Sequence, residues 1–187
     1  MSDALADRRK ELEETFFAKQ NQKLVDQLKA QAQQALDKAG IQELTGIQNE
    51  AVLEKLISLK LNRETIHALS LFPLVQVAWA DGAVDAKEQA AVLAAAQASG
   101  INQGSSAHTL LESWLKLKPP AAFELAWSNY VTALVEGMKP EEKTLLKSEL
   151  LGKARSVAEA SGGILGMGNK ISKPEADALK KLEAAFN

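Results

Sequence analysis

The chain has 187 residues, no cysteine and a formal net charge of −2, with 46% hydrophobic and 25% charged residues. This length and composition are typical of one globular domain, or of one domain with an appendage, that buries its core without disulfides. The absence of cysteine excludes thiolate nucleophiles and cysteine-based zinc sites. The small net charge provides no field that would attract nucleic acid, so we expect no nucleic-acid partner.

The N-terminal sequence MSDALADRRKELEE lacks the apolar core of a signal peptide. No stretch of the chain approaches 18 consecutive apolar residues, so we expect no transmembrane segment. With the lack of cysteine, these features predict a cytoplasmic protein.

Residues 3–39 are predicted to form one long helix. Its large apolar residues are spaced by four and seven positions and make a thin stripe, formed by Leu5, Leu12, Phe16, Phe17, Leu24, Val25, Leu28 and Leu36. A polar gap at residues 18–23 interrupts this stripe. Gly40 is predicted to end the helix as its C′ residue. We therefore expect an N-terminal helical arm at residues 1–40, which either docks on the body or joins a partner helix, and a helical domain at residues 41–187.

The rest of the chain is rich in helix-forming residues and contains no alternating β-branched run, which predicts an all-α fold of about eight or nine helices. Caps and prolines mark the expected helix starts, at Asn49, Asn62, Pro73, Asp85, Ser105 or Ser106, Pro120, Pro140 and Ser172. Pro73 either starts a helix or kinks a continuing one. The apolar run at residues 74–79 predicts a central, buried helix that ends at Asp81-Gly82.

The segment DGAVDAKE at residues 81–88 follows this central helix. Asp81-Gly82 predicts a tight turn, and Asp85 with Glu88 has the spacing of a capping box for the next helix. Residues 168–175, GNKISKPE, repeat the pattern with one constant offset. Ile171 then corresponds to Val84, and the second box is formed by Ser172 and Glu175. The repeat predicts two pseudo-symmetric helix–turn–helix units whose apolar residues meet near the pseudo-axis.

The stretch at residues 80–88 resembles the signature of the TerB-like family, which includes tellurite-resistance TerB proteins and the N-terminal region of DjlA-type membrane co-chaperones. The resemblance covers roughly residues 62–187 and implies a compact helical bundle with two A-D-G-x-[IV]-x-x-x-E turns. The second turn departs from this pattern, because Gly168-Asn169 stands where the family often has Asp-Gly. An acidic ligand is therefore missing from that turn.

The carboxylates of Asp81, Asp85 and Glu88 have two interpretations. TerB-like proteins bind Ca²⁺ or similar ions through such acids, so the resemblance implies a divalent-cation site at these residues, and hard cations prefer oxygen ligands. The alternative is architectural, with Asp81 in the turn and the other two in the capping box. The spacing does not match an EF-hand loop.

Other sequence features do not indicate catalysis. The Gly-rich segment at residues 162–169 lacks the Lys-Ser/Thr ending and the preceding strand of a phosphate-binding loop. We expect its apolar residues Ile164, Leu165 and Met167 to contact the core. His67 and His108 are expected at surface or partly satisfied positions. Because no nucleophile, base or cofactor motif is present, we predict that the protein is not an enzyme.

These observations predict a non-enzymatic interaction or adaptor module of TerB-like type, with an unidentified protein partner and a stress- or envelope-related role implied by the resemblance. The alternative is an inhibitory or assembly protein that acts through its arm. The arm itself, with Asp7-Arg8-Arg9-Lys10 and Phe16-Phe17, is similar to the start of a small helical inhibitor subunit of bacterial F-type ATPases. The sequence leaves the oligomeric state open.

Overall fold

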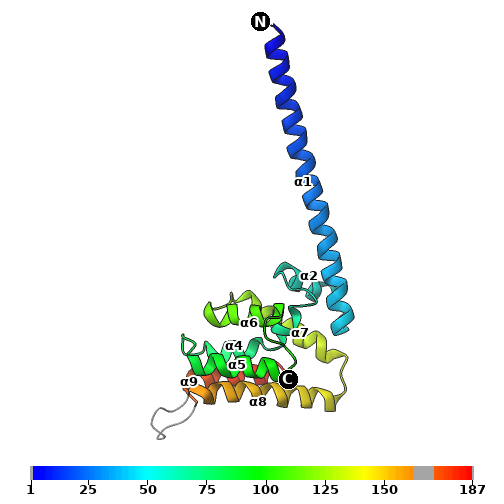
Figure 1. The fold of residues 1–187 in the computed structure, drawn as a ribbon. Helices are drawn as coiled ribbons and strands as arrows, with labels where there is room; N and C mark the ends of the chain where they lie inside the picture. The colour runs from blue at the N-terminus through cyan, green and yellow to red at the C-terminus, as the bar shows by residue number, and fades with distance from the viewer. Residues whose placement is uncertain (1, 162–170, 187) are drawn as a thin grey trace.

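In the computed structural model, residues 2–161 and 171–186 are described, and side-chain packing is described from Thr15 onward. Within these residues the chain forms nine helices and no strand, which confirms the all-α prediction. The helices, drawn in Figure 1, are α1 (Ser2–Thr45), α2 (Glu50–Ser58), α3 (Ile66–Ser70), α4 (Phe72–Ala78), α5 (Ala86–Ala98), α6 (Ser106–Lys116), α7 (Ala122–Glu136), α8 (Pro140–Ser161) and α9 (Lys173–Ala184).

Helix α1 projects from a body formed by the other helices, and its N-terminus lies at the far end (Figure 1). The prediction that Gly40 ends this helix is wrong, because α1 continues to Thr45. A Cβ atom at position 40 would lie only 3.1 Å from the Cβ of Arg63, so glycine here allows a close approach of the body. The helix ends instead at Thr45, and the next residue, Gly46, has a φ of +72°, which favours glycine.

The last turns of α1 attach the arm to the body. Ile41 is completely buried in the core. Lys38 forms an ion pair with Glu50 on α2, and Arg63 lies 2.5 Å from Glu43. Exposed ion pairs contribute little to stability, so the buried Ile41 side chain is the main anchor of α1.

Helix α4 is the centre of the body. It packs against α3, α5, α6, α7, α8 and α9, and Leu74, Val75 and Ala78 have no exposed surface. Pro73 lies in the first turn of α4, so the first of its two predicted roles is confirmed. At this end of α4, the ring centroid of Phe72 lies 5.6 Å from that of Trp114 in an edge-to-face arrangement, which adds directional packing to apolar burial.

Most predicted caps are present. The side chains of Asn49 and Ser105 accept hydrogen bonds from the backbone N–H groups of Val52 and His108. Asn62 differs from the prediction, because its Oδ1 accepts from the N–H groups of Glu64 and Thr65 and so caps the turn before α3. Local side-chain-to-backbone bonds therefore define where α2, α5, α6 and α9 begin.

Two sequence-based expectations concern residues that the structure does not describe. These are the expected contact of Ile164, Leu165 and Met167 with the core and the turn at Gly168-Asn169, and both lie outside the described residues.

In the described part of the chain, no helix combines the length and the apolar character needed to cross a membrane.

The attachment of α1 gives a stability prediction. Ile41→Ala removes a completely buried side chain and should lower the free energy of unfolding by about 2–5 kcal/mol. Leu145→Ala on α8, where the side chain is 60% exposed, serves as the control and should change this free energy by less than about 0.5 kcal/mol. Urea unfolding followed by tryptophan fluorescence measures both values, because all three tryptophans lie in the body. Equal effects of the two substitutions would contradict the assigned anchor.

Candidate functional site: two capped turns at the centre of the body

The first turn connects α4 to α5. Oδ1 of Asp81 accepts a hydrogen bond from the N–H of Ala83 at 3.2 Å, as in an Asx turn. Gly82 has a φ of +101°, a conformation that favours glycine. The Asp-Gly pair therefore has a structural role in reversing the chain.

The second half of this segment is the predicted capping box. Oδ1 of Asp85 accepts from the N–H groups of Lys87 and Glu88 at 2.7 and 2.8 Å. In return, Oε2 of Glu88 accepts from the N–H of Asp85 at 2.9 Å. Glu88 is only 2% exposed, so this cap places a carboxylate inside the body.

The turn before α9 contains an equivalent box. The N–H of Ser172 donates to Oε2 of Glu175 at 2.5 Å, and the N–H of Glu175 donates to Oγ of Ser172. Glu175 is 3% exposed, which matches the burial of Glu88. Val84 and Ile171, the matched apolar residues, are both partly buried against the core. The sequence repeat therefore corresponds to equivalent caps with equivalent burial.

The two turns belong to helices that pack against one another. Helix α4 contacts α8 and α9, and α5 contacts α8. Burial raises the pKa of the Glu88 carboxyl from 4.5 to about 7, while its hydrogen bond with the Asp85 backbone acts in the opposite direction. The carboxylates of Asp85, Asp81 and Glu175 raise this pKa further by charge repulsion. The second turn is thus close enough for Glu175 to influence Glu88.

The described residues contain no group of three histidine or acidic side chains arranged to hold a metal ion. Asp81, Asp85 and Glu88 each accept a backbone N–H, which gives every one of these carboxylates a role without a cation. The sequence-based hypothesis of a divalent-cation site at these three residues therefore stays a prediction, and the architectural interpretation now has direct hydrogen-bond support.

His108 differs from the expectation of a surface or partly satisfied position, because it is buried near the start of α6. Its Nδ1 lies 4.0 Å from Oε1 of Glu112. The sequence contained the signal for this pair, since the two residues are four positions apart on one helix face. The other histidine, His67, lies on α3 and is exposed.

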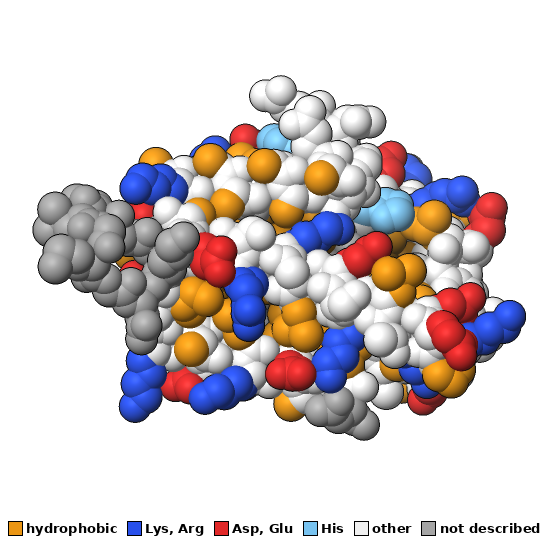
Figure 2. Space-filling model, turned by 90° about the horizontal axis from the view of Figure 1, so that it is seen from below, with side chains coloured by type: hydrophobic (Ala, Val, Ile, Leu, Met, Phe, Trp, Pro, Cys, Tyr) orange, Lys and Arg blue, Asp and Glu red, His pale blue; other side chains and the backbone are white. Residues whose placement is uncertain are grey.

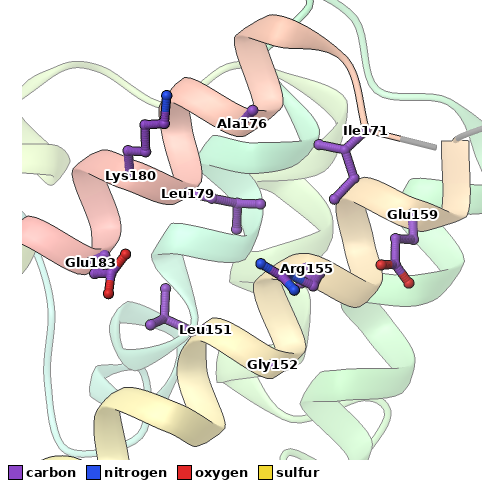
Figure 3. Close-up of a pocket in the computed structure, with 9 residues that line it drawn as sticks. All are labelled: Leu151, Gly152, Arg155, Glu159, Ile171, Ala176, Leu179, Lys180 and Glu183. Atoms are coloured by element: carbon purple, nitrogen blue, oxygen red, sulfur yellow. The ribbon is translucent and has the colours of Figure 1, made fainter. Parts of the chain in front are cut away.

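A shallow groove of about 810 Å³ runs between α8 and α9. Figure 3 shows Leu151 and Arg155 on α8 and Leu179 on α9 between the two helices. The charged residues that line the groove balance, with Arg155 and Lys180 against Glu159 and Glu183. The described residues therefore give this groove apolar side chains together with equal numbers of positively and negatively charged side chains.

Sequence reasoning did not predict a second groove, of about 550 Å³, beside α4, α7 and α9. Aromatic residues Phe72, Trp79 and Trp127 line it together with three prolines. Nε1 of Trp127 has no hydrogen-bond partner among the described residues, and surrounding protein atoms cover it. Lys118, Glu124, Asp177 and Lys181 also line this groove, so its surface combines apolar rings with charges of both signs.

Charge is mixed on the face seen in Figure 2, where basic and acidic side chains alternate with apolar ones and neither sign forms a continuous area.

Comparisons with protein-family models, curated proteins and solved structures gave no match. The resemblance to TerB-like proteins therefore rests on residues 80–88, and the second turn departs from the family pattern.

The raised pKa of Glu88 predicts a pH-dependent stability. Between about pH 4.5 and 7 the folded protein holds a proton that the unfolded chain releases, so stability falls as pH rises through this window. The contribution of this group is at most about 3 kcal/mol. Glu88→Gln removes the titration and keeps a hydrogen-bond acceptor, so its stability relative to wild type should be about 1–3 kcal/mol more favourable at pH 8 than at pH 5. Urea unfolding at both pH values measures this difference, and parallel pH profiles would contradict it.

The cation hypothesis predicts a calorimetric signal. Ca²⁺ titrated into the wild-type protein should give heat of binding, and Asp81→Ala should abolish that heat because it removes one of three oxygen ligands. A parallel titration with Zn²⁺ tests the alternative ion. If the wild type gives no heat with either ion, the carboxylates have only their hydrogen-bonding roles.

Proposed function

We propose that this protein is a non-enzymatic interaction module, of TerB-like type, that uses α1 as a docking helix for assembly with a protein partner. The observation that carries this proposal is the exposure of large apolar side chains along the projecting arm. Phe17 is 62% exposed, Leu28 is 55% exposed and Leu36 is 67% exposed. Phe16, Leu24 and Val25 are exposed to a similar degree.

The arm places part of its apolar surface, at Phe17, Leu24 and Leu28, opposite its charged residues, whereas Phe16 and Leu36 lie beside Lys23 and Lys29. Between residues 16 and 36 the charged residues are spaced by three or four positions and therefore share one side of the helix, at Lys19, Lys23, Asp26 and Lys29. The opposite side carries apolar and amide residues. This arrangement is typical of a helix that packs against another surface along one side.

Exposed apolar side chains at this density favour association. The residues from Phe16 to Leu36 are all exposed, and α2 is the helix against which α1 packs in the described part of the chain. Helices in proteins owe most of their stability to packing of an apolar face, and contiguous exposed apolar surface is typical of interaction sites. A partner would supply the packing that the body does not provide.

The body serves as the base of this docking helix. Ile41 and the ion pairs at Lys38 and Glu43 hold the end of α1 against the body. The resemblance of the two turns to TerB-like proteins supports a role in stress-related assemblies of the cytoplasm. In this proposal the pseudo-symmetric pair of helix–turn–helix units is a scaffold, supported by the equivalent caps at Asp85 and Ser172.

Site-specific photo-crosslinking in the host cell tests the docking role. A photo-reactive phenylalanine analogue at Leu28 should form protein adducts, because this position lies on the apolar side of the arm. The same analogue at Gln33, on the charged side of α1, is the matched control. If the partner covers only the apolar side, Gln33 should give at least about tenfold fewer adducts than Leu28. Equal labelling at both positions, or no adduct at Leu28, would show that the arm has no docked partner.

A further inference from the structure

The uncharged side of α1 contains a short repeat that is symmetric in sequence. Its central positions are alternately four and three residues apart, the spacing of a two-helix seam. They are Phe17, Asn21, Leu24, Leu28, Gln31 and Ala35. All six are exposed. None is charged, so two copies of this seam can approach without repulsion between like charges.

Reversing one copy of this seam gives complementary pairs. In an antiparallel arrangement centred on residue 26, Leu24 faces Leu28 of the second copy. One step outward, Asn21 faces Gln31, and side-chain amides both donate and accept hydrogen bonds. At the ends, Phe17 faces Ala35. Each pair occurs twice because the arrangement has two-fold symmetry.

A parallel arrangement fits less well. It would place Phe17 against its own copy at one end and Ala35 against its own copy at the other. Two phenylalanines demand a wider helix separation than two alanines, and the distance between packed helix axes depends on the side chains between them. The antiparallel pairing combines the large residue with the small one at both ends, so one separation suits the whole seam.

The body does not block this seam. Ile41, which faces the body, lies six residues beyond Ala35, so its side chain points about 120° away from the seam. In the antiparallel arrangement the two bodies lie at opposite ends of the pair. The second arm can therefore approach along residues 17–35 without contact between the two globular parts.

The apolar area of the seam corresponds to a weak pair. The seam contains three large apolar side chains, Phe17, Leu24 and Leu28, and each is more than half exposed. If each loses roughly 100 Å² of exposed surface, two copies bury about 600 Å² of apolar surface. An interface of this size is typical of weak association.

From these observations we infer that the partner of the arm is a second copy of this chain, joined through an antiparallel pair of α1 helices centred on residue 26. The inference rests on the proposed docking role of α1 and names its partner. It assigns the seam to the residues from Phe17 to Ala35 and leaves both bodies exposed for further contacts.

Solution mass tests the dimer with matched charge variants of the full chain. Light scattering after size exclusion at about 50 µM, a concentration suited to micromolar affinity, should give twice the 20.1 kDa of one chain. Leu24→Lys with Leu28→Lys places two charges in the seam and should give the monomer mass. Gln22→Lys with Gln33→Lys adds the same charge on the outer side and should remain dimeric.

Disulfide trapping tests the orientation, because the chain has no cysteine of its own. Disulfides need Cα atoms within about 7 Å. Leu24→Cys and Leu28→Cys should each form little covalent dimer alone and at least about fivefold more when mixed, since residue 24 faces residue 28 of the other copy. Gln33→Cys on the outer side is the control and should stay uncrosslinked.

Each outcome decides the inference. A wild-type monomer, or a seam variant as dimeric as its control, overturns the dimer. Crosslinking of Leu24→Cys with itself as efficient as in the mixture overturns the antiparallel register. If the photo-crosslinker at Leu28 labels only a different protein while the wild type is monomeric, the self-pairing fails and the proposed docking function stands.

Discussion

The burial of α4 is the constraint on which the body depends. This short helix packs against six other helices, and its side chains at Leu74, Val75 and Ala78 have no exposed surface. Because other helices surround α4, the chain reverses direction in a tight turn directly after it. Asp81-Gly82 forms this turn, in which the Asp81 side chain accepts a backbone hydrogen bond. The capping box that follows starts α5 immediately, so the Glu88 carboxylate is carried into the body.

The buried carboxylate of Glu88 both caps a helix and has a raised pKa. Glu88 satisfies an orphan N–H at a helix start, which stabilises the cap. The same position excludes water, and burial raises its pKa to about 7. A cap on the surface would have no such effect. The three carboxylates of this segment all accept backbone hydrogen bonds, and Glu88 differs from the other two in its raised pKa.

The arm follows a different rule from the body. In the body most large apolar side chains are buried, whereas the six large apolar side chains from Phe16 to Leu36 are exposed. Their exposure and the one-sided placement of charge are the observations behind both proposals. The self-complementary order of Phe17, Leu24, Leu28 and Ala35 with two amides then distinguishes a second copy from an unrelated helix.

The sequence by itself determined the features that depend on neighbouring residues. Helix starts at Asn49, Asp85, Ser105 and Ser172 were predictable because a cap is a hydrogen bond across two or three residues. Tertiary structure alone decided what depends on distant segments. Gly40 did not end α1, which continues to Thr45, and Arg63 packs so closely on Gly40 that a Cβ would lie only 3.1 Å from the Cβ of Arg63. The burial of Glu88, and its proximity to Glu175, arise from the packing of α4 and α5 on α8 and α9, which no local pattern in the sequence records.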